Sequence, residues 1–245
     1  MSGASTNRFL IVGESGSGKS RKASELIDGY RAEGKRPNVV MLQMGPAEGS
    51  ELERHALAVV EIDDKAAAAP ADYTRMIQAE RRLLFEVTAV DSIEWLQRIG
   101  RACLDAGNAL VVIDEAAELV TSKAPPEFLA LWTRGRIRSV DIIAVCQSIK
   151  HRPAIGLNRV AVNRSTCLIA FQCSDSAELD ELRRRFPATG DYLHRLQSPR
   201  DGGPPEFAVR DALTGREALY LRSGRYSPTT QEDPIHGDAD HTPTA

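Results

Sequence analysis

Residues 10–20 form an apolar segment that leads directly into a glycine-rich loop ending in lysine and serine. The segment reads LIVGESGSGKS and fills every fixed position of the pattern G-x-x-x-x-G-K-[ST]. Glycines at this spacing let backbone N–H groups turn toward phosphate oxygens, while the lysine supplies a cation and the serine a hydroxyl for Mg²⁺. Apolar residues at helical spacing follow, so strand, loop and helix occur in the required order. The sequence therefore predicts a site for ATP and Mg²⁺. Its expected binding residues are Gly13, Glu14, Ser15, Gly16, Ser17, Gly18, Lys19 and Ser20.

Two acidic residues, Asp114 and Glu115, end a second apolar run at residues 110–113. A buried parallel strand delivers such residues to the carboxyl edge of the sheet, where ligands bind in open α/β folds. We therefore expect Asp114 to support Mg²⁺ together with Ser20. Glu115, one residue further on, is expected to orient and polarise an attacking water. This pair favours hydrolysis over transfer of a phosphoryl group to a bound acceptor.

A glutamine, Gln147, ends the apolar run at residues 141–146. An amide at a strand end can contact the γ-phosphate or the attacking water, or it can be a structural amide. Upstream, on or beside a helix expected to begin near Pro126, lies the sequence RGRIR with Arg136 at its centre. An arginine there is either a solvated side chain or, in a ring of subunits, a group that stabilises transition-state charge in a neighbour's site.

Short apolar runs alternate with helical or turn-like segments along most of the chain, which predicts a mainly parallel sheet with helices on both faces, a three-layer α/β sandwich. Two runs at 207–211 and 217–221 flank a turn sequence and predict a C-terminal β-hairpin. The expected strands are 9–12, 38–43, 83–87, 109–113, 141–146 and 167–171. The expected organisation is a flexible lead at 1–7, one domain at 8–223 with an insertion at 46–80, and a disordered acidic tail at 224–245. Within the insertion we expect short helices near 51–57 and 72–79.

The composition is that of one sizeable α/β domain, because 42% of the 245 residues are hydrophobic. The longest apolar stretches have strand length, so the sequence predicts no membrane span, and residues 1–8 lack the apolar core of a signal peptide. The four cysteines have no metal-ligand spacing and are expected to be thiols in a reducing cytoplasm. The net charge of −3 alone gives no reason to expect nucleic acid. Basic residues do cluster locally, either as a solvated face or as contacts to a phosphate backbone. The candidates for DNA contact are Lys150, Arg152, Arg183 and Arg184.

Taken together, these motifs resemble those of the FtsK–HerA superfamily of DNA-pumping P-loop ATPases. The resemblance rests on GESGSGKS, on VVIDE, on Arg136 eleven residues before Gln147, and on the later strand LIAFQCS, and it covers residues 8–222. A chain of this length without further domains is most similar to the genome-packaging ATPases of tailless, internal-membrane (tectivirus-like) phages.

That resemblance implies a RecA/FtsK-like P-loop fold and a homo-oligomeric ring, a hexamer, that pumps double-stranded DNA without sequence preference into a preformed capsid. Capsid vertex proteins would be its partners, and the host cytoplasm and the virion vertex its locations. It also implies that Lys19 is catalytic, that Gln147 senses the γ-phosphate and that Arg136 acts across subunits. The chain departs from FtsK-like motors after Gln147, where SIKHRP replaces an immediate Arg-Pro, and this leaves the DNA-contact role of Lys150 and Arg152 open.

Three other functions fit parts of the pattern. A Zot-type ATPase for assembly and export of filamentous phage shares the P-loop core but usually carries a membrane span. A slow P-loop switch protein would hydrolyse without moving DNA. A nucleotide kinase needs an arginine-rich lid, whereas the insertion holds only Arg54 and Arg75.

Overall fold

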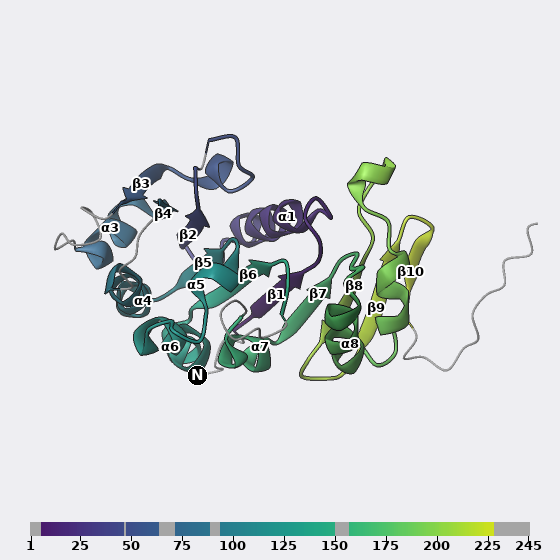
Figure 1. Cartoon of the computed structure of the whole chain (residues 1–245). Helices are drawn as coiled ribbons and strands as arrows, with labels where there is room; N and C mark the ends of the chain where they lie inside the picture. Colours follow the sequence, from purple (N-terminus) through teal and green to yellow (C-terminus); the bar gives the residue numbers. More distant parts are fainter. Residues whose placement is uncertain (1–5, 47, 64–71, 89–93, 150–156, 228–245) are drawn as a thin grey trace, which may run out of the picture.

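The computed structural model describes residues 6–46, 48–63, 72–88, 94–149 and 157–227. Ten strands in this part of the chain form a single sheet (Figure 1). The strands are β1 (Arg8–Val12), β2 (Asn38–Met44), β3 (Ala58–Ile62), β4 (Arg82–Val87), β5 (Ala109–Ile113), β6 (Asp141–Cys146), β7 (Cys167–Ala170), β8 (Phe207–Asp211), β9 (Glu217–Leu221) and β10 (Gly224–Tyr226). Their order across the sheet is β10-β9-β8-β7-β1-β6-β5-β2-β4-β3. The seven strands from β7 to β3 are parallel, and β8, β9 and β10 add an antiparallel end.

Helices cover both faces of the sheet, so the predicted three-layer α/β architecture is confirmed. Helix α1 packs on one face, and α6, α7 and α8 lie on the other (Figure 1). The helices are α1 (Lys19–Ala32), α3 (Tyr73–Glu80), α4 (Glu94–Ala106), α5 (Ala116–Leu119), α6 (Pro126–Arg134), α7 (Arg159–Arg164) and α8 (Ser176–Arg185). Short 3₁₀ turns are η1 (Glu53–His55), η2 (Gly135–Arg138), η3 (Gly190–Arg195) and η4 (Pro199–Asp201). None of the helices in the described ranges is long and apolar enough to cross a membrane.

Alternate residues of the central strands pack into two separate cores, because successive side chains of a strand point to opposite faces. In β1, Ile11 joins the core beneath α1, while Val12 joins the larger core on the other face. Helix α1 contributes Ala23, Ile27 and Tyr30, which share one side of the helix at the i, i+4, i+7 spacing. Every residue of β5 and β6 is buried, as expected for central parallel strands.

The insertion at residues 46–80 contains a strand that the sequence did not predict. Edge strand β3 pairs in parallel with β4, placing Val60 opposite Phe85. Val59 and Glu61 are exposed and Ile62 is buried, and the sequence of β3 lacks the long apolar run that marks the central strands. The two expected helices appear as η1 and α3, and residues 47 and 64–71 of the insertion lie outside the described residues.

Both ends of the domain extend further than predicted. Residues 224–226, expected in the disordered tail, form β10 against β9, where the Arg225 guanidinium lies 5.5 Å from the centre of the Tyr220 ring. At the other end, the Asn7 backbone N–H donates to Asp141 at 2.7 Å, so the lead is tied down before β1 begins. Residues 1–5 and 228–245 lie outside the described residues.

Candidate nucleotide-binding site

The glycine-rich loop between β1 and α1 has a backbone that only glycine adopts easily. Gly16 and Gly18 have φ angles of 75° and 103°, in the region disfavoured for residues with a Cβ. Gly18 is the residue from which α1 begins, so the loop delivers the chain directly to a helix N-terminus. Backbone N–H groups at such a terminus are unpaired within the helix and favour an anion.

Inside the loop lie two polar side chains whose hydrogen-bonding capacity is not satisfied. Lys19 is only 6% exposed, and its Nζ donates to the Glu14 carbonyl oxygen at 2.7 Å. No carboxylate of the described residues forms an ion pair with it. Burial lowers the pKa of Lys19, while the nearby charges of Glu115 and Asp114 act in the opposite direction. The Ser17 Oγ is buried and has no hydrogen-bond partner in the described part of the chain. An unpaired buried cation and an orphaned hydroxyl fit a site built for phosphate.

The two predicted carboxylates stand beside this loop at the end of β5. The Asp114 backbone N–H donates to the Leu42 carbonyl at 2.9 Å, and its carboxylate accepts from the Glu115 backbone N–H at 3.1 Å. Burial raises the pKa of Asp114, an effect partly offset by that bond and by a hydrogen bond with Ser20. The structure thus brings Ser20 and Asp114 together, as the sequence predicted for Mg²⁺.

These residues fit a Mg²⁺ site that takes few protein ligands. The described residues contain no group of three or more His, Cys, Asp or Glu side chains placed to hold a metal ion. Mg²⁺ in nucleotide sites is usually held by one or two protein oxygens, with water and phosphate oxygens completing its octahedron. The Ser20 hydroxyl and the Asp114 carboxylate supply that number.

Glu115 has a left-handed backbone, with φ 50° and ψ 47°, which is uncommon for a residue other than glycine. Its Oε1 accepts a hydrogen bond at 3.1 Å from Nε2 of Gln147, which follows β6. Because β1, β6 and β5 are neighbours in the sheet, the loop, the glutamine and the acidic pair meet at one edge. The structure therefore brings these three motifs together at one edge of the sheet.

Glu14 joins the loop to the segment that follows β7. Its backbone N–H donates to the Gln172 carbonyl at 3.0 Å, and its carboxylate accepts from the Ser174 backbone N–H. On the crest of the loop, Ser15 and Gly16 are exposed. The loop is thus fixed at its start, and its crest is partly exposed to solvent.

Comparisons with known proteins find solved structures of similar fold. No protein-family model matches the sequence. The genome-packaging NTPase B204 of Sulfolobus turreted icosahedral virus 2, solved with AMPPCP, is similar over 87% of this chain and 96% of its own, with a TM-score of 0.68 and 15% identity. VirB4 of Thermoanaerobacter pseudethanolicus is similar over 94% of this chain and 90% of its own, with a TM-score of 0.55 and 13% identity. The chain has the P-loop NTPase fold of these two proteins.

Two further similarities are weaker. The N-terminal domain of zonular occludens toxin from Neisseria meningitidis matches at a TM-score of 0.43 and 16% identity, over 89% of this chain and 95% of that domain. A ribosomal RNA large subunit methyltransferase H from Methylobacterium sp. (strain 4-46) is 38% identical over 56 residues, which are 21% of this chain. The aligned part spans about a third (35%) of the methyltransferase.

Arg136 does not join the P-loop site of its own chain. It lies in η2, which precedes β6, whereas Gln147 follows β6, so the two residues are at opposite edges of the sheet. Its side chain is exposed. This place in the fold argues against action on the nucleotide of its own chain, and both interpretations of Arg136, a solvated side chain and a contact with a second chain, remain open.

Of the four candidates for DNA contact, two form ion pairs with nearby acidic residues. Arg183 pairs with Asp191 at 2.9 Å and with Asp180 at 3.3 Å, and Arg184 pairs with Glu181. These local partners favour the interpretation of a solvated helix face for α8. Lys150 and Arg152 lie outside the described residues.

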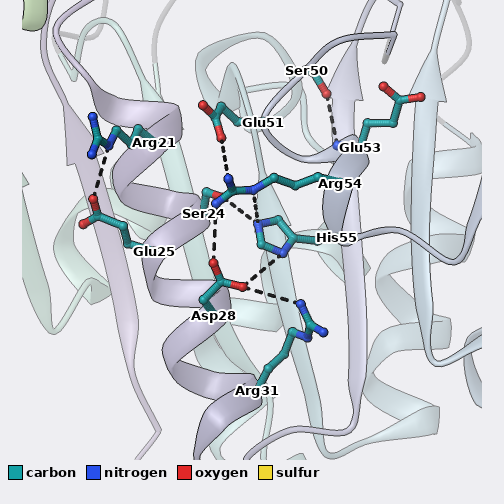
Figure 2. Close-up of polar contacts among 10 residues, drawn as sticks. All are labelled: Arg21, Ser24, Glu25, Asp28, Arg31, Ser50, Glu51, Glu53, Arg54 and His55. Atoms are coloured by element: carbon teal, nitrogen blue, oxygen red, sulfur yellow. Dashed lines mark hydrogen bonds and ion pairs between the residues drawn. The ribbon is translucent and has the colours of Figure 1, made fainter.

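A Ser–His–Asp arrangement joins α1 to the insertion, and the sequence did not indicate it (Figure 2). The Ser24 Oγ lies 2.5 Å from Nε2 of His55, and the His55 Nδ1 lies 3.6 Å from a carboxylate oxygen of Asp28. Ser24 is 0% exposed and His55 only 1%, so no substrate reaches the hydroxyl. Burial lowers the pKa of His55. The arrangement is a buried polar cluster that fixes η1 on the P-loop helix.

One residue at the site had no signal in the sequence. Arg200, in η4, lies directly against Gly16 on the crest of the phosphate loop. It is 184 positions further along the chain, in a proline- and glycine-containing loop without a recognisable motif. Only the fold brings the two together.

Proposed function

We propose that this protein is an ATPase that uses hydrolysis to move double-stranded DNA, in the role of a viral genome-packaging motor at a capsid vertex. The observation that carries the proposal is the meeting of Lys19, Asp114, Glu115 and Gln147 at one edge of the sheet. The fold is similar to that of a genome-packaging NTPase solved with AMPPCP. This similarity supports ATP as the bound nucleotide and suggests genome packaging as the task.

The residues of the site divide the work of hydrolysis. Lys19 and the loop N–H groups bind the β- and γ-phosphates, and Ser20 and Asp114 would hold Mg²⁺, which would supply positive charge to neutralise the phosphates. Glu115 orients a water for in-line attack on the γ-phosphorus and accepts its proton, so that one P–O bond forms as the bond to the ADP oxygen breaks. Gln147, bonded to Glu115 at 3.1 Å, fixes the rotamer of that carboxylate.

In the proposed ring, Arg136 of one subunit acts on the nucleotide that its neighbour binds. Arg136 is exposed at the edge opposite to the nucleotide, so it reaches a phosphate only in a neighbouring subunit. Arginines supplied in this way stabilise transition-state charge and raise rates by about 10³–10⁵ in other NTPases. A catalytic role for Arg136 therefore requires a second copy of the chain beside each nucleotide site, and a ring provides one. The proposed ring is a hexamer. Lys150 and Arg152 remain the proposed contacts to the DNA backbone.

The test is steady-state ATP hydrolysis with and without long double-stranded DNA. We expect duplex DNA to stimulate turnover, and we expect the stimulation to weaken as salt rises, because phosphate contacts release counterions. A Lys150→Ala, Arg152→Ala double variant should lose stimulation while keeping basal turnover. Hydrolysis that ignores DNA would contradict the motor and favour a slow P-loop switch.

A further inference from the structure

Residues 197–206 form a loop before β8 that packs on the phosphate loop. A Cβ built on Gly16 would lie 2.5 Å from both Nε and Nη2 of Arg200, and one on Gly18 would lie 3.0 Å from Pro205. The guanidinium therefore rests on the crest of the phosphate loop, and a proline ring covers its last glycine. The loop rises on the same face of the sheet as α1 (Figure 1).

The base of this loop is held by Glu206 and Arg222. The Glu206 carboxylate accepts from the backbone N–H groups of Gln197 and Arg222, both at 2.9 Å. The Arg222 guanidinium donates to the carbonyls of Ser198 at 3.0 Å and Pro204 at 3.1 Å. The Glu206 N–H also donates to the Gln197 carbonyl at 2.9 Å, so the two ends of the loop are tied to each other, and Arg222 ties them to the antiparallel end of the sheet. The position of Arg200 is built by the fold.

Within the described part of the chain, Arg200 has no partner for its charge. Its backbone N–H donates to the Ser198 Oγ at 3.3 Å, and its guanidinium pairs with no carboxylate of the described residues. A planar guanidinium binds phosphate through two parallel hydrogen bonds and keeps its charge at any physiological pH. The buried Lys19 ammonium and the orphaned Ser17 hydroxyl belong to the phosphate loop that Arg200 lies against, so within the described residues three groups without an anionic partner lie in or against this loop.

We propose that Arg200 binds the β- and γ-phosphates of the nucleotide in its own chain. The proposal deepens the proposed function and rests on the loop being an ATP site. It assigns to Arg200 a role separate from that of Arg136, because Arg136 lies at the opposite edge of the sheet and serves a neighbour. Because Glu206 and Arg222 join the loop to β8 and β9, the antiparallel end of the sheet becomes the element that responds to the phosphates.

The test is calorimetric titration of AMPPCP and of AMP, each with Mg²⁺, into the wild type and the variants Arg200→Ala and Arg200→Lys. Loss of one charge-assisted hydrogen-bonding group predicts AMPPCP binding weakened about 10- to 100-fold in Arg200→Ala. AMP binding should change less than about 2-fold, because AMP lacks both phosphates. The lysine variant should recover part of the loss, since it restores the charge without the fork.

A matched control is Arg195→Ala, which removes an exposed arginine of η3 whose Nε bonds to His194 at 3.2 Å. It should bind AMPPCP like the wild type. Unchanged thermal unfolding of the ligand-free Arg200→Ala protein separates lost contact from lost structure. If Arg200→Ala binds AMPPCP as tightly as the wild type does, the role of Arg200 is overturned and the proposed ATP site is not. Equal losses of affinity for AMP and for AMPPCP would also overturn the role of Arg200. A wild type that binds no AMPPCP would overturn the proposed ATP site itself.

Discussion

Replacing Glu115 by glutamine separates the hydrolysis step from nucleotide binding. The change removes one negative charge and keeps the size and shape of the side chain. The amide oxygen of the new residue can still accept the 3.1 Å hydrogen bond from Gln147 Nε2, so the neighbouring side chains stay in place. What is lost is the ability to take a proton from water.

The expected loss in turnover is about 10²- to 10⁴-fold, the usual contribution of a positioned general base. That loss corresponds to about 3–5 kcal/mol of activation free energy. Binding should not suffer, because the Glu115 charge repels both Asp114 and an incoming triphosphate. Since the charge of Glu115 helps to raise the pKa of Asp114, its removal also favours the ionised form of Asp114.

The assay is release of inorganic phosphate at saturating ATP, paired with a titration of AMPPCP. The control is Glu118→Gln, the same chemical change three residues later on the exposed side of α5. We expect wild-type turnover from this control and wild-type or tighter AMPPCP binding from Glu115→Gln. Turnover in Glu115→Gln within about threefold of the wild type would refute the general-base assignment, because such a loss is far below the range of that effect.

Three further predictions concern stability and are checked by urea unfolding. Asp141→Ala leaves the Arg36 guanidinium, 2.8 Å from Asp141 Oδ2 and 12% exposed, without its partner, and should cost about 3–5 kcal/mol. Gly100→Ala places a Cβ 2.6 Å from the Phe128 Cα and should cost about 1–3 kcal/mol, whereas an unchanged midpoint would show that α4 and α6 separate freely. Because His55 has a lowered pKa in the folded protein, its imidazole becomes protonated at a higher pH in the unfolded chain than in the folded one. Stability should therefore decline as pH falls below 6.5, and the decline should be smaller in His55→Gln.

Much of this architecture could be predicted because its signals are local. The phosphate loop, the carboxylates after β5 and the glutamine after β6 each follow a buried apolar run, and parallel strands bring such ends to one edge. Edge strand β3 escaped prediction because Val59 and Glu61 are exposed, so its five residues lack the continuous buried apolar run that marks the central strands.

The contacts that the sequence did not reveal are those between distant segments. Arg200 reaches Gly16 only because β8 runs beside β7, which lies beside β1. The Ser24–His55 bond likewise depends on how the insertion folds back over α1. Neither pair has a spacing or composition that marks it, since the geometry is set by tertiary packing.

The central claim is that hydrolysis moves DNA through a ring of these chains. Displacement of a third strand from a triplex on long duplex DNA measures that movement directly. We expect displacement that requires ATP, fails with AMPPCP and is absent in Glu115→Gln. DNA-stimulated hydrolysis by the wild type without any displacement of the third strand would contradict it.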